Sequence, residues 1–385
     1  MNAKLKVWGS DLIEPATLVQ AERTARLPVV EGVRLMPDAH IGKGATVGSV
    51  VATRNAIIPA AVGVDIGCGM AALRTDIVAD QLPDSLDALL PRVAKAVPAG
   101  VGVAKRGENA EGGRWMGDHG GRFSRALESA LQAKAIQQMG SLGSGNHFLE
   151  VDVDEDDRVW LVLHSGSRGI GNILGSEHIK TASQLAKEAH IILEDRDLAW
   201  LDEGTDTFAM YVNDMLLCQD YARVNRAVML DSAFGAFREW LGRDVVATDR
   251  INCHHNFAQR EEHDGHQVWV TRKGAIQATE GQLGIIPGSM GDKTYIISGR
   301  GNADSYHSCA HGAGRQRSRG QAKRELNTRD LTRRMRGITW MADRANALLD
   351  EHPSAYKDID RVMAAQRDLV VQVHTLKQIL NYKGL

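Results

Sequence analysis

An aspartate and a cysteine stand close together in a stretch that otherwise predicts buried backbone. The segment VDIGCGMAAL, residues 64–73, holds Asp65 and Cys68 among glycines, between apolar flanks. Burying a carboxylate is costly unless its charge is compensated, and a carboxylate with a thiolate can bind a divalent metal ion. The alternative is structural: Cys68 is then a small apolar side chain, and Asp65 caps nearby backbone. This segment alone leaves both interpretations open.

Several histidines lie in or beside loops of glycine and small residues, where a side chain can point into a cleft. They are His147 in GSLGSGNHFLE, His164 in VLHSGSRG, His254 and His255 in INCHHNF, and His311 in SCAHGAGR. Any one of them alone is best explained as a hydrogen-bonded structural residue. Together with a carboxylate and a thiolate they form a ligand set for a transition metal, and this set favours zinc. Spacing alone does not establish that they converge.

Short glycine and serine loops indicate phosphate chemistry. HSGSRGIG, GSLGSGN, PGSMG and HGAGR can each surround an anion with backbone amides. No Walker A loop, GxGxxG after a strand, GxSxG elbow or HExxH pair occurs, which argues against common nucleotide-binding and hydrolase classes. The KxDG lysine of ordinary nucleotidyl-transferring ligases is also absent. Arg168, in one of these loops, suits bidentate phosphate recognition or a surface ion pair.

A basic run follows His311. Its members are Arg315, Arg317, Arg319, Lys323, Arg324, Arg329, Arg333, Arg334 and Arg336. Such runs are usually solvated faces, but this one begins beside a glycine-flanked histidine and so predicts a path for a polyanion toward His311. The formal net charge of the whole chain is only −2, so a polyanion must be held by a local patch of this kind.

The elements that must position these residues follow from periodicity. Strands are predicted within residues 30–75 and at 158–164, 266–276 and 293–299. Helices are predicted over 123–135, with Gly140 as the stop, over 175–242, with Phe208, Tyr211, Val212, Met215 and Leu216 on one face, and again from Thr328 onward. Because strand and helix blocks do not alternate regularly, the pattern favours an α+β fold over a doubly wound sheet.

Composition sets wider limits. The 385 residues are 43% hydrophobic and contain 39 glycines, and the four cysteines form no CxxC pair, which fits a reducing compartment. The start has no apolar h-region and no 18-residue apolar run occurs, so we expect a cytoplasmic protein without membrane contact. No linker or repeat divides the chain, and residues 1–385 are expected to form a single catalytic domain.

Nine ordered motifs together resemble the RtcB family of RNA-splicing ligases. They are MPDAHIGKG, GVDIGCGM, GSGNHFLE, HSGSRGIG, INCHHN, PGSMG, HGAGR, YKDID and the closing KG. The resemblance runs from about residue 30 to the C-terminus. It implies an α+β, RtcB-like fold with a β-rich core, surrounding helices and a deep polar cleft.

The resemblance also implies an activity. Such enzymes join RNA ends bearing a 3′-phosphate or 2′,3′-cyclic phosphate to 5′-hydroxyl ends, with GTP and two Mn²⁺ ions, through a guanylylated histidine and an RNA-ppG intermediate. The nucleophile matches His311. The metal ligands match Asp65, Cys68, His147, His164 and His255. Manganese is thus implied by the family, whereas the ligand chemistry alone favours zinc.

The same resemblance assigns contacts to substrates. The residues matching the GMP or GTP site are Asn146, His147, Phe148, Leu149, Glu150, His255, Asn256, Pro287, Gly288, Ser289, Met290, Thr294, His311, Gly312, Ala313, Gly314 and Lys383. Arg168 matches a residue that meets the RNA phosphate. Thr294 stands where the family often has serine, and one residue, Leu385, follows the closing KG.

Two alternatives remain within and beyond this activity. A family member can cap 3′-phosphate ends of RNA or DNA with GMP, or open cyclic phosphates, without sealing. A non-catalytic RNA-binding relative is the other, and the intact His311 and ligand positions argue against it. The physiological RNA, the oligomeric state and the need for an archease-type activator are not given by the sequence.

Overall fold

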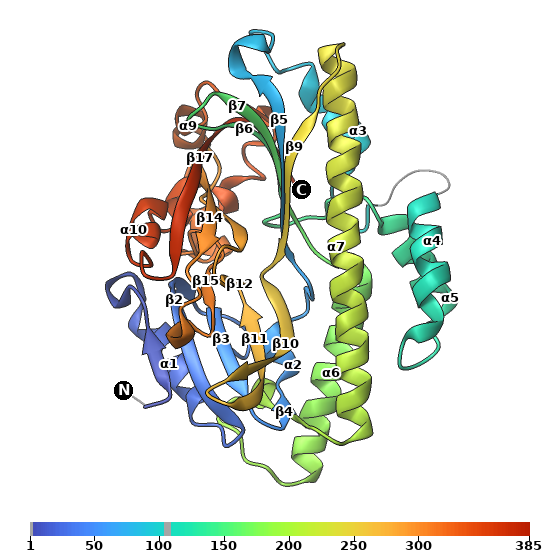
Figure 1. Ribbon diagram of the computed structural model, residues 1–385, viewed down its shortest axis with the longest axis vertical. Coiled ribbons are helices and arrows are strands. Elements are labelled where there is room, and N and C mark those ends of the chain that lie inside the picture. The colour runs from blue at the N-terminus through green and yellow to red at the C-terminus, as the bar shows by residue number, and fades with distance from the viewer. Residues whose placement is uncertain (1–2, 104–108) are drawn as a thin grey trace.

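The computed structural model describes residues 3–103 and 109–385. Two sheets pack face to face, and the longest helix lies along the outer side of the larger sheet (Figure 1). Most strand pairs are antiparallel, and no regular strand–helix alternation occurs in the described residues. The α+β prediction is therefore confirmed, and the assignment of one domain stays a prediction.

The smaller main sheet is five-stranded, in the order β1-β2-β3-β11-β10. Its strands are β1 (Leu5–Val7), β2 (Val30–His40), β3 (Val47–Thr53), β10 (Asn256–His263) and β11 (His266–Lys273). Only β1 and β2 pair in parallel within it. The predicted strand at 266–276 is confirmed as β11 and the short β12 (Ala275–Gln277).

The larger sheet is eight-stranded, in the order β13-β14-β17-β6-β7-β5-β9, with β16 beside β17. Its strands are β5 (Gly69–Val78), β6 (Phe148–Val153), β7 (Arg158–Ser165), β9 (Ala247–His254), β13 (Leu283–Pro287), β14 (Lys293–Gly299), β16 (Thr339–Trp340) and β17 (Val370–Lys383). β7 and β14 confirm the strands predicted at 158–164 and 293–299. Two small ribbons complete the strands: β12 with β15 (Ser308–Ala310), and β4 (Ala56–Ile57) with β8 (Leu201–Asp202).

The register of the larger sheet aligns the ends of its strands. Gly69, which follows Cys68, pairs with Ser165 on one side and His254 on the other. Phe148, which follows His147, pairs with His164 and with Lys383. Side chains that are far apart in the sequence therefore meet at one edge of the sheet, because each lies at or just beyond the end of its strand.

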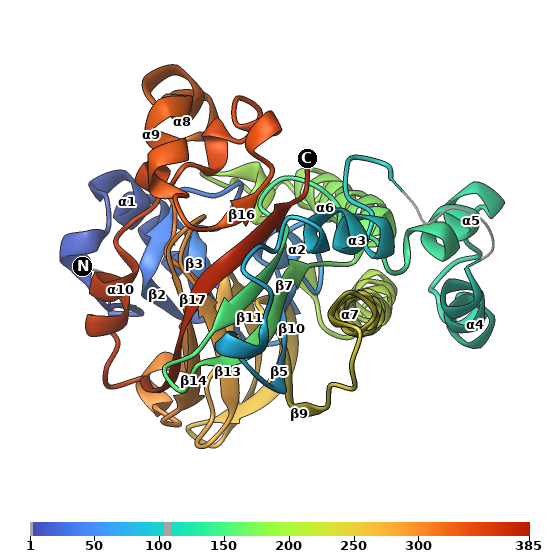
Figure 2. The ribbon, with the colours of Figure 1, turned by 90° about the horizontal axis from the view of Figure 1, so that it is seen from above.

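The helices cover the sheets from outside. They are α1 (Pro15–Ala25), α2 (Pro59–Val62), α3 (Leu89–Ala96), α4 (Ala110–His119), α5 (Ser129–Gln138), α6 (Arg168–Glu188), α7 (Asp206–Leu241), α8 (Arg319–Glu325), α9 (Thr328–Arg334) and α10 (Ile359–Ala364). α7 has 36 residues and packs on β5, β7 and β9, whereas α4 and α5 project beside it (Figure 2). No helix among the described residues has both the length and the apolar character needed to cross a membrane.

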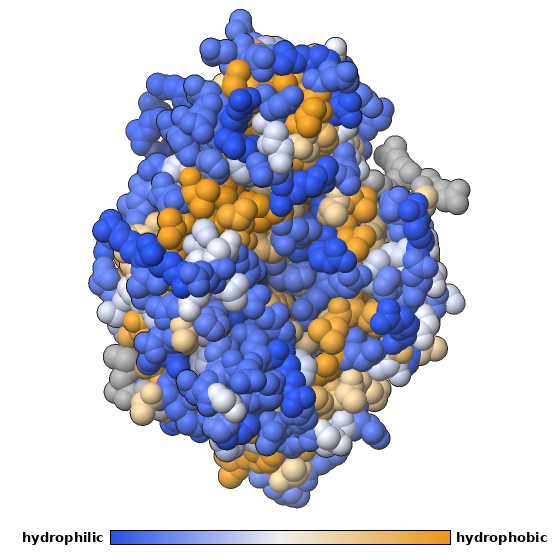
Figure 3. Space-filling model, viewed as in Figure 1, coloured by the Kyte–Doolittle hydropathy of each residue, from blue (hydrophilic) through white to orange (hydrophobic). Residues whose placement is uncertain are grey.

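Alternate residues of the larger sheet face two different cores. Met70 and Ala72 of β5 pack between the two sheets, whereas Ala71 and Leu73 pack toward α3 and α7. The sheet is thus buried on both faces, which explains why segments such as RVWLVLHS carry almost no polar alternation. The outer surface is mostly hydrophilic in the view of Figure 3, with apolar residues in scattered patches.

Two predicted helices have different limits. The helix predicted over 123–135 begins only at Ser129, because Ser124 donates its backbone N–H and its hydroxyl to Asp214 and this holds the preceding loop outside the helix. The helical stretch predicted over 175–242 is divided into α6 and α7 by a segment that contains β8. Leu216 lies 47% exposed, outside the apolar face that was predicted to include it.

The prediction of a helical tail from Thr328 onward is wrong for the longest element of that region, which is a strand. Helices α9 and α10 lie there, but residues Val370–Lys383 form β17, a central strand of the larger sheet. The segment VVQVHTLKQILNYK exposes Val371, Gln372 and Val373 in its first half and buries most of its second half. Pairing with β14, β6 and β16 therefore decides its conformation, and this long-range pairing is not visible in the local pattern.

Candidate active site

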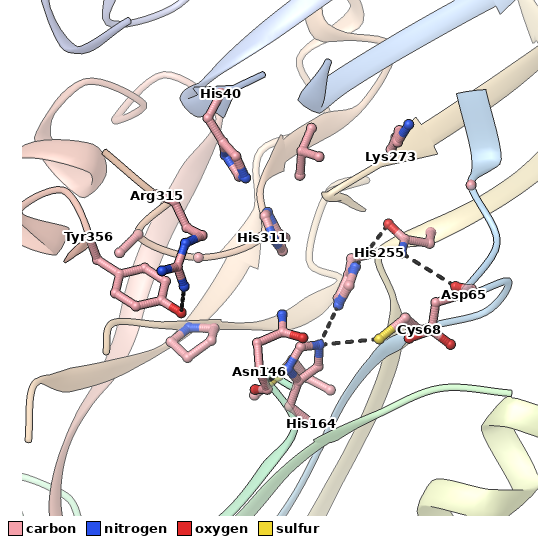
Figure 4. Close-up of a pocket in the computed structure, with 18 of the residues that line it drawn as sticks. His40, Asp65, Cys68, Asn146, His164, His255, Lys273, His311, Arg315 and Tyr356 are labelled. Carbon is pink, nitrogen blue, oxygen red and sulfur yellow. Dashed lines mark hydrogen bonds between the residues drawn. The ribbon is translucent and has the colours of Figure 1, made fainter. Parts of the chain in front are cut away.

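The aligned strand ends open into a cavity of about 400 Å³ (Figure 4). Asp65 and Cys68 lie on its wall, followed around the cavity by His164, His255 and His311. The lining residues come from both main sheets and from the loop after β15, so the cavity lies where these parts of the chain meet.

Backbone hydrogen bonds fix the turn that carries Asp65 and Cys68. The Cys68 N–H donates to the Asp65 carbonyl at 3.1 Å, and the His255 N–H donates to the Cys68 carbonyl at 2.7 Å. Gly67 has φ +73°, and a Cβ there would lie 2.8 Å from Ala222 of α7, so only glycine fits this contact. Close packing against α7 thus fixes the position of this turn in the cavity wall.

Sulfur and imidazole nitrogens converge in this wall. The Cys68 Sγ lies 3.2 Å from His164 Nε2 and 3.5 Å from His147 Nε2. His164 Nε2 lies 2.8 Å from His255 Nε2, and His147 Nε2 lies 3.2 Å from the Asp65 carboxylate. The five residues assigned by resemblance to a metal site are therefore brought together, and all but Asp65 are buried.

Each of the three histidines is oriented through its other ring nitrogen. His147 Nδ1 lies 2.8 Å from the Leu142 carbonyl, and His164 Nδ1 lies 3.2 Å from the Asn146 carbonyl. His255 Nδ1 lies 3.2 Å from Asn256 Oδ1, an oxygen that also accepts the Gly274 N–H. Since these partners are acceptors, the proton of each neutral ring belongs on Nδ1, and the lone pairs of the Nε2 atoms face one another.

Protonation in the absence of a metal follows from burial. Burial and the nearby Asp65 carboxylate raise the pKa of the Cys68 thiol well above its usual value. Burial lowers the pKa of His164 and of His255, helped by the neighbouring histidines.

This donor set fits a metal ion. Three imidazole Nε2 lone pairs, a buried thiol and a carboxylate converge without a proton donor that satisfies them all. Cys68, His147 and His164 offer ligand atoms within 4.8 Å of one another. Metal-binding histidines typically donate the N–H of their other ring nitrogen to a carbonyl or carboxylate oxygen, as these three do.

His311 lies beside this cluster and is held by Asp38. Its ring centroid is 4.8 Å from that of His255. Asp38 Oδ2 accepts from the His311 ring at Nδ1, 2.6 Å away, and from its backbone N–H at 3.1 Å. Nδ1 therefore carries the proton, and Nε2 keeps a lone pair. Sequence reasoning did not assign a role to Asp38, although it lies in the quoted motif MPDAHIGKG.

A family model described as tRNA-splicing ligase RtcB matches residues 20–384. The chain belongs to the RtcB family. The RNA-splicing ligase RtcB of Escherichia coli (strain K12) is 42% identical over 408 residues, which cover 100% of this chain and 98% of that protein. The tRNA-splicing ligase RtcB of Nanoarchaeum equitans is 30% identical over 443 residues, with 96% and 92% covered. The family predicted from the motifs is thus confirmed.

Most residues matched to the RtcB guanylate site line the cavity. They are Asn146, Phe148, Glu150, His255, Asn256, Pro287, Gly288, Ser289, His311, Gly312, Ala313, Gly314 and Lys383. His147 lies behind them in the cysteine–histidine cluster. Leu149 packs on the opposite face of β6, and Met290 belongs to an apolar cluster with Leu331 and Met335.

Thr294, Arg168 and His254 lie away from the cavity lining. Thr294 is fully buried beside the Glu150 carboxylate, and Arg168 begins α6 with its Nε 3.4 Å from Ser141 Oγ. His254 is held by the Gly67 carbonyl at 2.9 Å and by Arg226 at 3.1 Å, so it supports the Cys68 turn from behind.

Glu150 is a buried acceptor at the edge of this RtcB-family cavity. Asn381 of β17 donates to its Oε1 at 2.9 Å, while its Oε2 has no hydrogen-bond partner among the described residues. Burial and the nearby Asp152 raise the pKa of Glu150 well above its usual value. A ligand with N–H donors at this point would satisfy the free oxygen.

A second acid, Glu351, organises the cations of the cavity. It accepts from Lys383 Nζ at 3.0 Å, Arg319 at 2.6 Å and the Tyr356 hydroxyl at 2.8 Å. Arg315 lies 3.3 Å away as well. Sequence reasoning missed Glu351, since nothing in LLDEHP indicates that it receives these groups.

Lys273 is a further residue that the sequence analysis did not single out. Its Nζ, buried at the cavity wall, donates to the carbonyls of Lys43, Ala45 and Ala60 at 2.5, 3.0 and 3.0 Å. Burial lowers its pKa to about 8. These bonds fix the loop after β2 against α2 at the mouth of the site.

The first half of the basic run, predicted as part of a path for a polyanion, pairs with acids of the same chain, and the path itself stays a prediction. Arg315 and Arg319 face Asp350 and Glu351, and Arg317 pairs with Glu325. Acids of the same chain thus already neutralise the cations nearest His311. The second half of the run lies elsewhere, on α9 and the loop after it.

Proposed function

We propose that this chain is a GTP- and Mn²⁺-dependent RNA ligase that joins 3′-phosphate or 2′,3′-cyclic phosphate ends to 5′-hydroxyl ends. One observation carries the proposal: the ring of His311, held at Nδ1 by Asp38, stands 4.8 Å from His255 of the cysteine–histidine cluster. A nucleophile beside a metal-binding cluster suits phosphoryl transfer. The relatives named RNA-splicing ligase and tRNA-splicing ligase support RNA as the substrate.

In the first step, His311 Nε2 attacks the α-phosphorus of GTP. A P–N bond forms, the bond to the β-phosphate oxygen breaks, and pyrophosphate leaves. The ring becomes positively charged as the bond forms, and the Asp38 carboxylate at 2.6 Å from Nδ1 stabilises that charge. Because Asp38 also holds the His311 backbone N–H, the ring cannot turn away from the cavity.

In the later steps GMP is passed to RNA and then released. An oxygen of the RNA 3′-phosphate attacks the guanylyl phosphorus, the P–N bond breaks, and RNA-ppG forms. The 5′-hydroxyl of the second strand then attacks the RNA phosphorus, loses its proton and expels GMP. A cyclic phosphate is first opened by water to a 3′-phosphate. By the family resemblance, Arg168 is assigned to the RNA phosphate and Lys383, which lines the cavity, to the guanylate.

The metal belongs to this proposal. Asp65, Cys68, His147, His164 and His255 would hold Mn²⁺, two ions being expected, which when bound neutralises phosphate charge in the transition state. Zinc suits the same thiolate and imidazoles, so the two metals must be compared directly.

Guanine specificity is assigned to Glu150. Its free Oε2 is an acceptor for the N–H groups on the edge of guanine, which adenine does not present in the same way. The loops 287–290 and 311–314 would surround the phosphates and sugar, with Lys383 at the far end. A cytoplasmic site of action is part of the proposal, because its substrates are cellular RNAs.

The first test is covalent labelling. Incubation with GTP and Mn²⁺ should add the mass of one GMP to the intact protein, ATP should not replace GTP, and His311→Ala should not be labelled. His266→Ala, in the exposed end of the β10–β11 hairpin, is the matched control and should be labelled like the unmodified chain. Labelling of His311→Ala, or none of the unmodified protein, would refute the mechanism and favour a non-catalytic relative.

The second test compares metals and ligand loss. Ligation of a labelled two-strand substrate should need Mn²⁺, and activity with Zn²⁺ alone would correct the metal. Cys68→Ala should lose bound metal and ligation but keep its thermal unfolding transition, whereas Cys218→Ala, equally buried in α7 but outside the cysteine–histidine cluster, should keep both. Accumulation of a ppG-capped strand that is never joined would favour the capping enzyme, unless an archease-type activator restores sealing.

A further inference from the structure

A second concave surface lies on the outer side of the site. It is a groove of about 760 Å³ formed by α9, the loop after it and β16, and we call it the α9 groove. Arg329, Arg333 and Arg336 line it, with Asp330 and Trp340. These arginines belong to the second half of the basic run, which does not line the catalytic cavity and has no part in the proposed mechanism.

The α9 groove carries an excess of positive charge. Asp330 is the one acid of its lining and already pairs with Arg333 and Arg334. Arg329 and Arg336 are exposed and form no ion pair with any residue that the structure describes. Two guanidinium groups are thus available to an anionic ligand, and guanidinium binds phosphate through paired donors.

An aromatic side chain stands beside these charges. Trp340 is only partly buried, and its inner side packs on the apolar cluster of Met290, Leu331, Met335 and Leu348. A ring fixed on one side and accessible on the other is suited to stack on a nucleic-acid base. Arginines with such a ring are the combination that binds single-stranded nucleic acid.

The α9 groove adjoins the catalytic cavity. A Cβ on Gly291 would lie 3.0 Å from Met335 Sδ and 3.3 Å from the Arg334 carbonyl, so α9 touches the loop that continues from Ser289 of the cavity. Trp340 pairs with Asn381, which donates to Glu150 inside the cavity. Figure 2 shows α9 and β16 on the same side of the molecule as the C-terminal end of the chain.

A second surface groove, at the end of α7, serves as a comparison for the charge and the aromatic lining of the α9 groove. At the end of α7, Arg238 and Arg243 are balanced by Glu239 and Asp244, and no aromatic residue lines the depression. Arg238 is paired with Asp244 at 3.3 Å. The contrast in charge and in aromatic lining singles out the α9 groove.

We propose that the α9 groove binds a single-stranded stretch of the substrate RNA, with phosphates on Arg329 and Arg336 and one base stacked on Trp340. This inference rests on the proposed function, since it takes RNA as the ligand. A strand held here would continue past the loop at residues 289–291 toward His311.

Binding is measured separately from catalysis. A fluorescent single-stranded RNA oligonucleotide with a 3′-phosphate is titrated by anisotropy without GTP, at several salt concentrations. R329A/R336A should weaken binding at least about fivefold and should lower the salt slope by about 1.4, since each phosphate contact on a single strand contributes about 0.7. R238A/R243A is the matched control and should bind like the unmodified chain.

Trp340 gives an independent arm. Trp340→Leu keeps apolar packing but removes the stacking ring, and should weaken binding of this RNA about fivefold or more, whereas Trp340→Phe should restore most of the affinity. Thermal unfolding of each variant checks that the fold is kept. GMP labelling of His311 by GTP and Mn²⁺, measured without RNA, should be unchanged in all of these variants.

The outcomes separate the two proposals. Equal RNA affinity in R329A/R336A and R238A/R243A would overturn the α9 groove as an RNA site, even if ligation proceeds as proposed. Parallel loss of GMP labelling would overturn it too, because the substitutions would then act on the cavity. Absence of GMP labelling in the unmodified protein would instead contradict the ligase mechanism. The RNA affinities of the variants would still decide whether the α9 groove binds RNA.

Discussion

The pair Asp38–His311 is the most consequential contact at the scale of single residues. The two residues are 273 positions apart, and the carboxylate holds both the ring and the backbone of the histidine. Asp38 is completely buried, so its charge is available to the imidazole with little screening by water. A carboxylate in this position selects the tautomer and, in the proposed mechanism, favours the cationic ring that forms during attack.

We therefore expect Asp38→Asn to slow GMP labelling of His311 by about 100-fold or more, as loss of a positioned catalytic partner does. The rate is followed by intact mass at saturating GTP, and a thermal melt verifies the fold. Asp264→Asn, exposed in the β10–β11 hairpin, serves as the control. A labelling rate for Asp38→Asn equal to that of the control would remove Asp38 from the mechanism.

At the scale of elements, the register of the strands explains what the sequence could and could not predict. The strand β7 was predicted because it is a continuous apolar run and β14 because it is rich in β-branched and aromatic residues, and the motif residues were found by resemblance. β17 was missed, since part of its first half is exposed and its position depends on partners far away in the chain. Asp38 and Glu351 were missed for the same reason: only pairing between distant segments shows what they contact.

Glu351 lies in a short turn and forms an ion pair with Lys383, the last residue of β17, so it links this turn to the end of the strand. Burial raises its pKa, but Lys383, Arg319 and the Tyr356 hydroxyl outweigh burial and lower it below the ordinary value of 4.5. A carboxyl with a lowered folded-state pKa contributes stability that is present above its unfolded-state value and is lost as the pH falls through the folded-state value.

Glu351→Gln should therefore lower the free energy of unfolding by about 3 kcal/mol near neutral pH, because the buried Lys383 loses its counter-charge. The deficit should shrink as the pH falls below the ordinary value of 4.5 and through the lower folded-state pKa, where the carboxyl of the folded unmodified chain becomes protonated. Urea unfolding near neutral pH and at the acid pH measures this difference in the free energy of unfolding. The exposed Glu239→Gln is the control. A deficit that is the same at both would contradict the assignment.

At the scale of the whole molecule, the catalytic cavity and the core depend on the same sheet. Its two faces bury separate apolar clusters, one against the smaller sheet and one against α3 and α7. β17 holds three neighbours, β14, β6 and β16, in this arrangement. The site and the stability of the molecule are therefore coupled through one strand.

Deletion of residues 371–385 should abolish cooperative unfolding, since β14 and β6 would each lose their pairing partner in the centre of the sheet. Circular dichroism during urea titration measures the transition. Removal of Leu385 alone is the matched control and should leave it intact, because β17 ends at Lys383. A sharp transition in the longer deletion would show that the sheet forms without β17.

The position of β17 also has a consequence for biosynthesis. The ribosome makes a chain from its N-terminus, and parts already made begin to fold as they emerge. Here the strand that completes the centre of the larger sheet, together with the lysine at the cavity, is translated after all of its partners in the sheet. Nascent chains and products of premature termination that stop before residue 370 therefore lack both the central strand and a complete cavity.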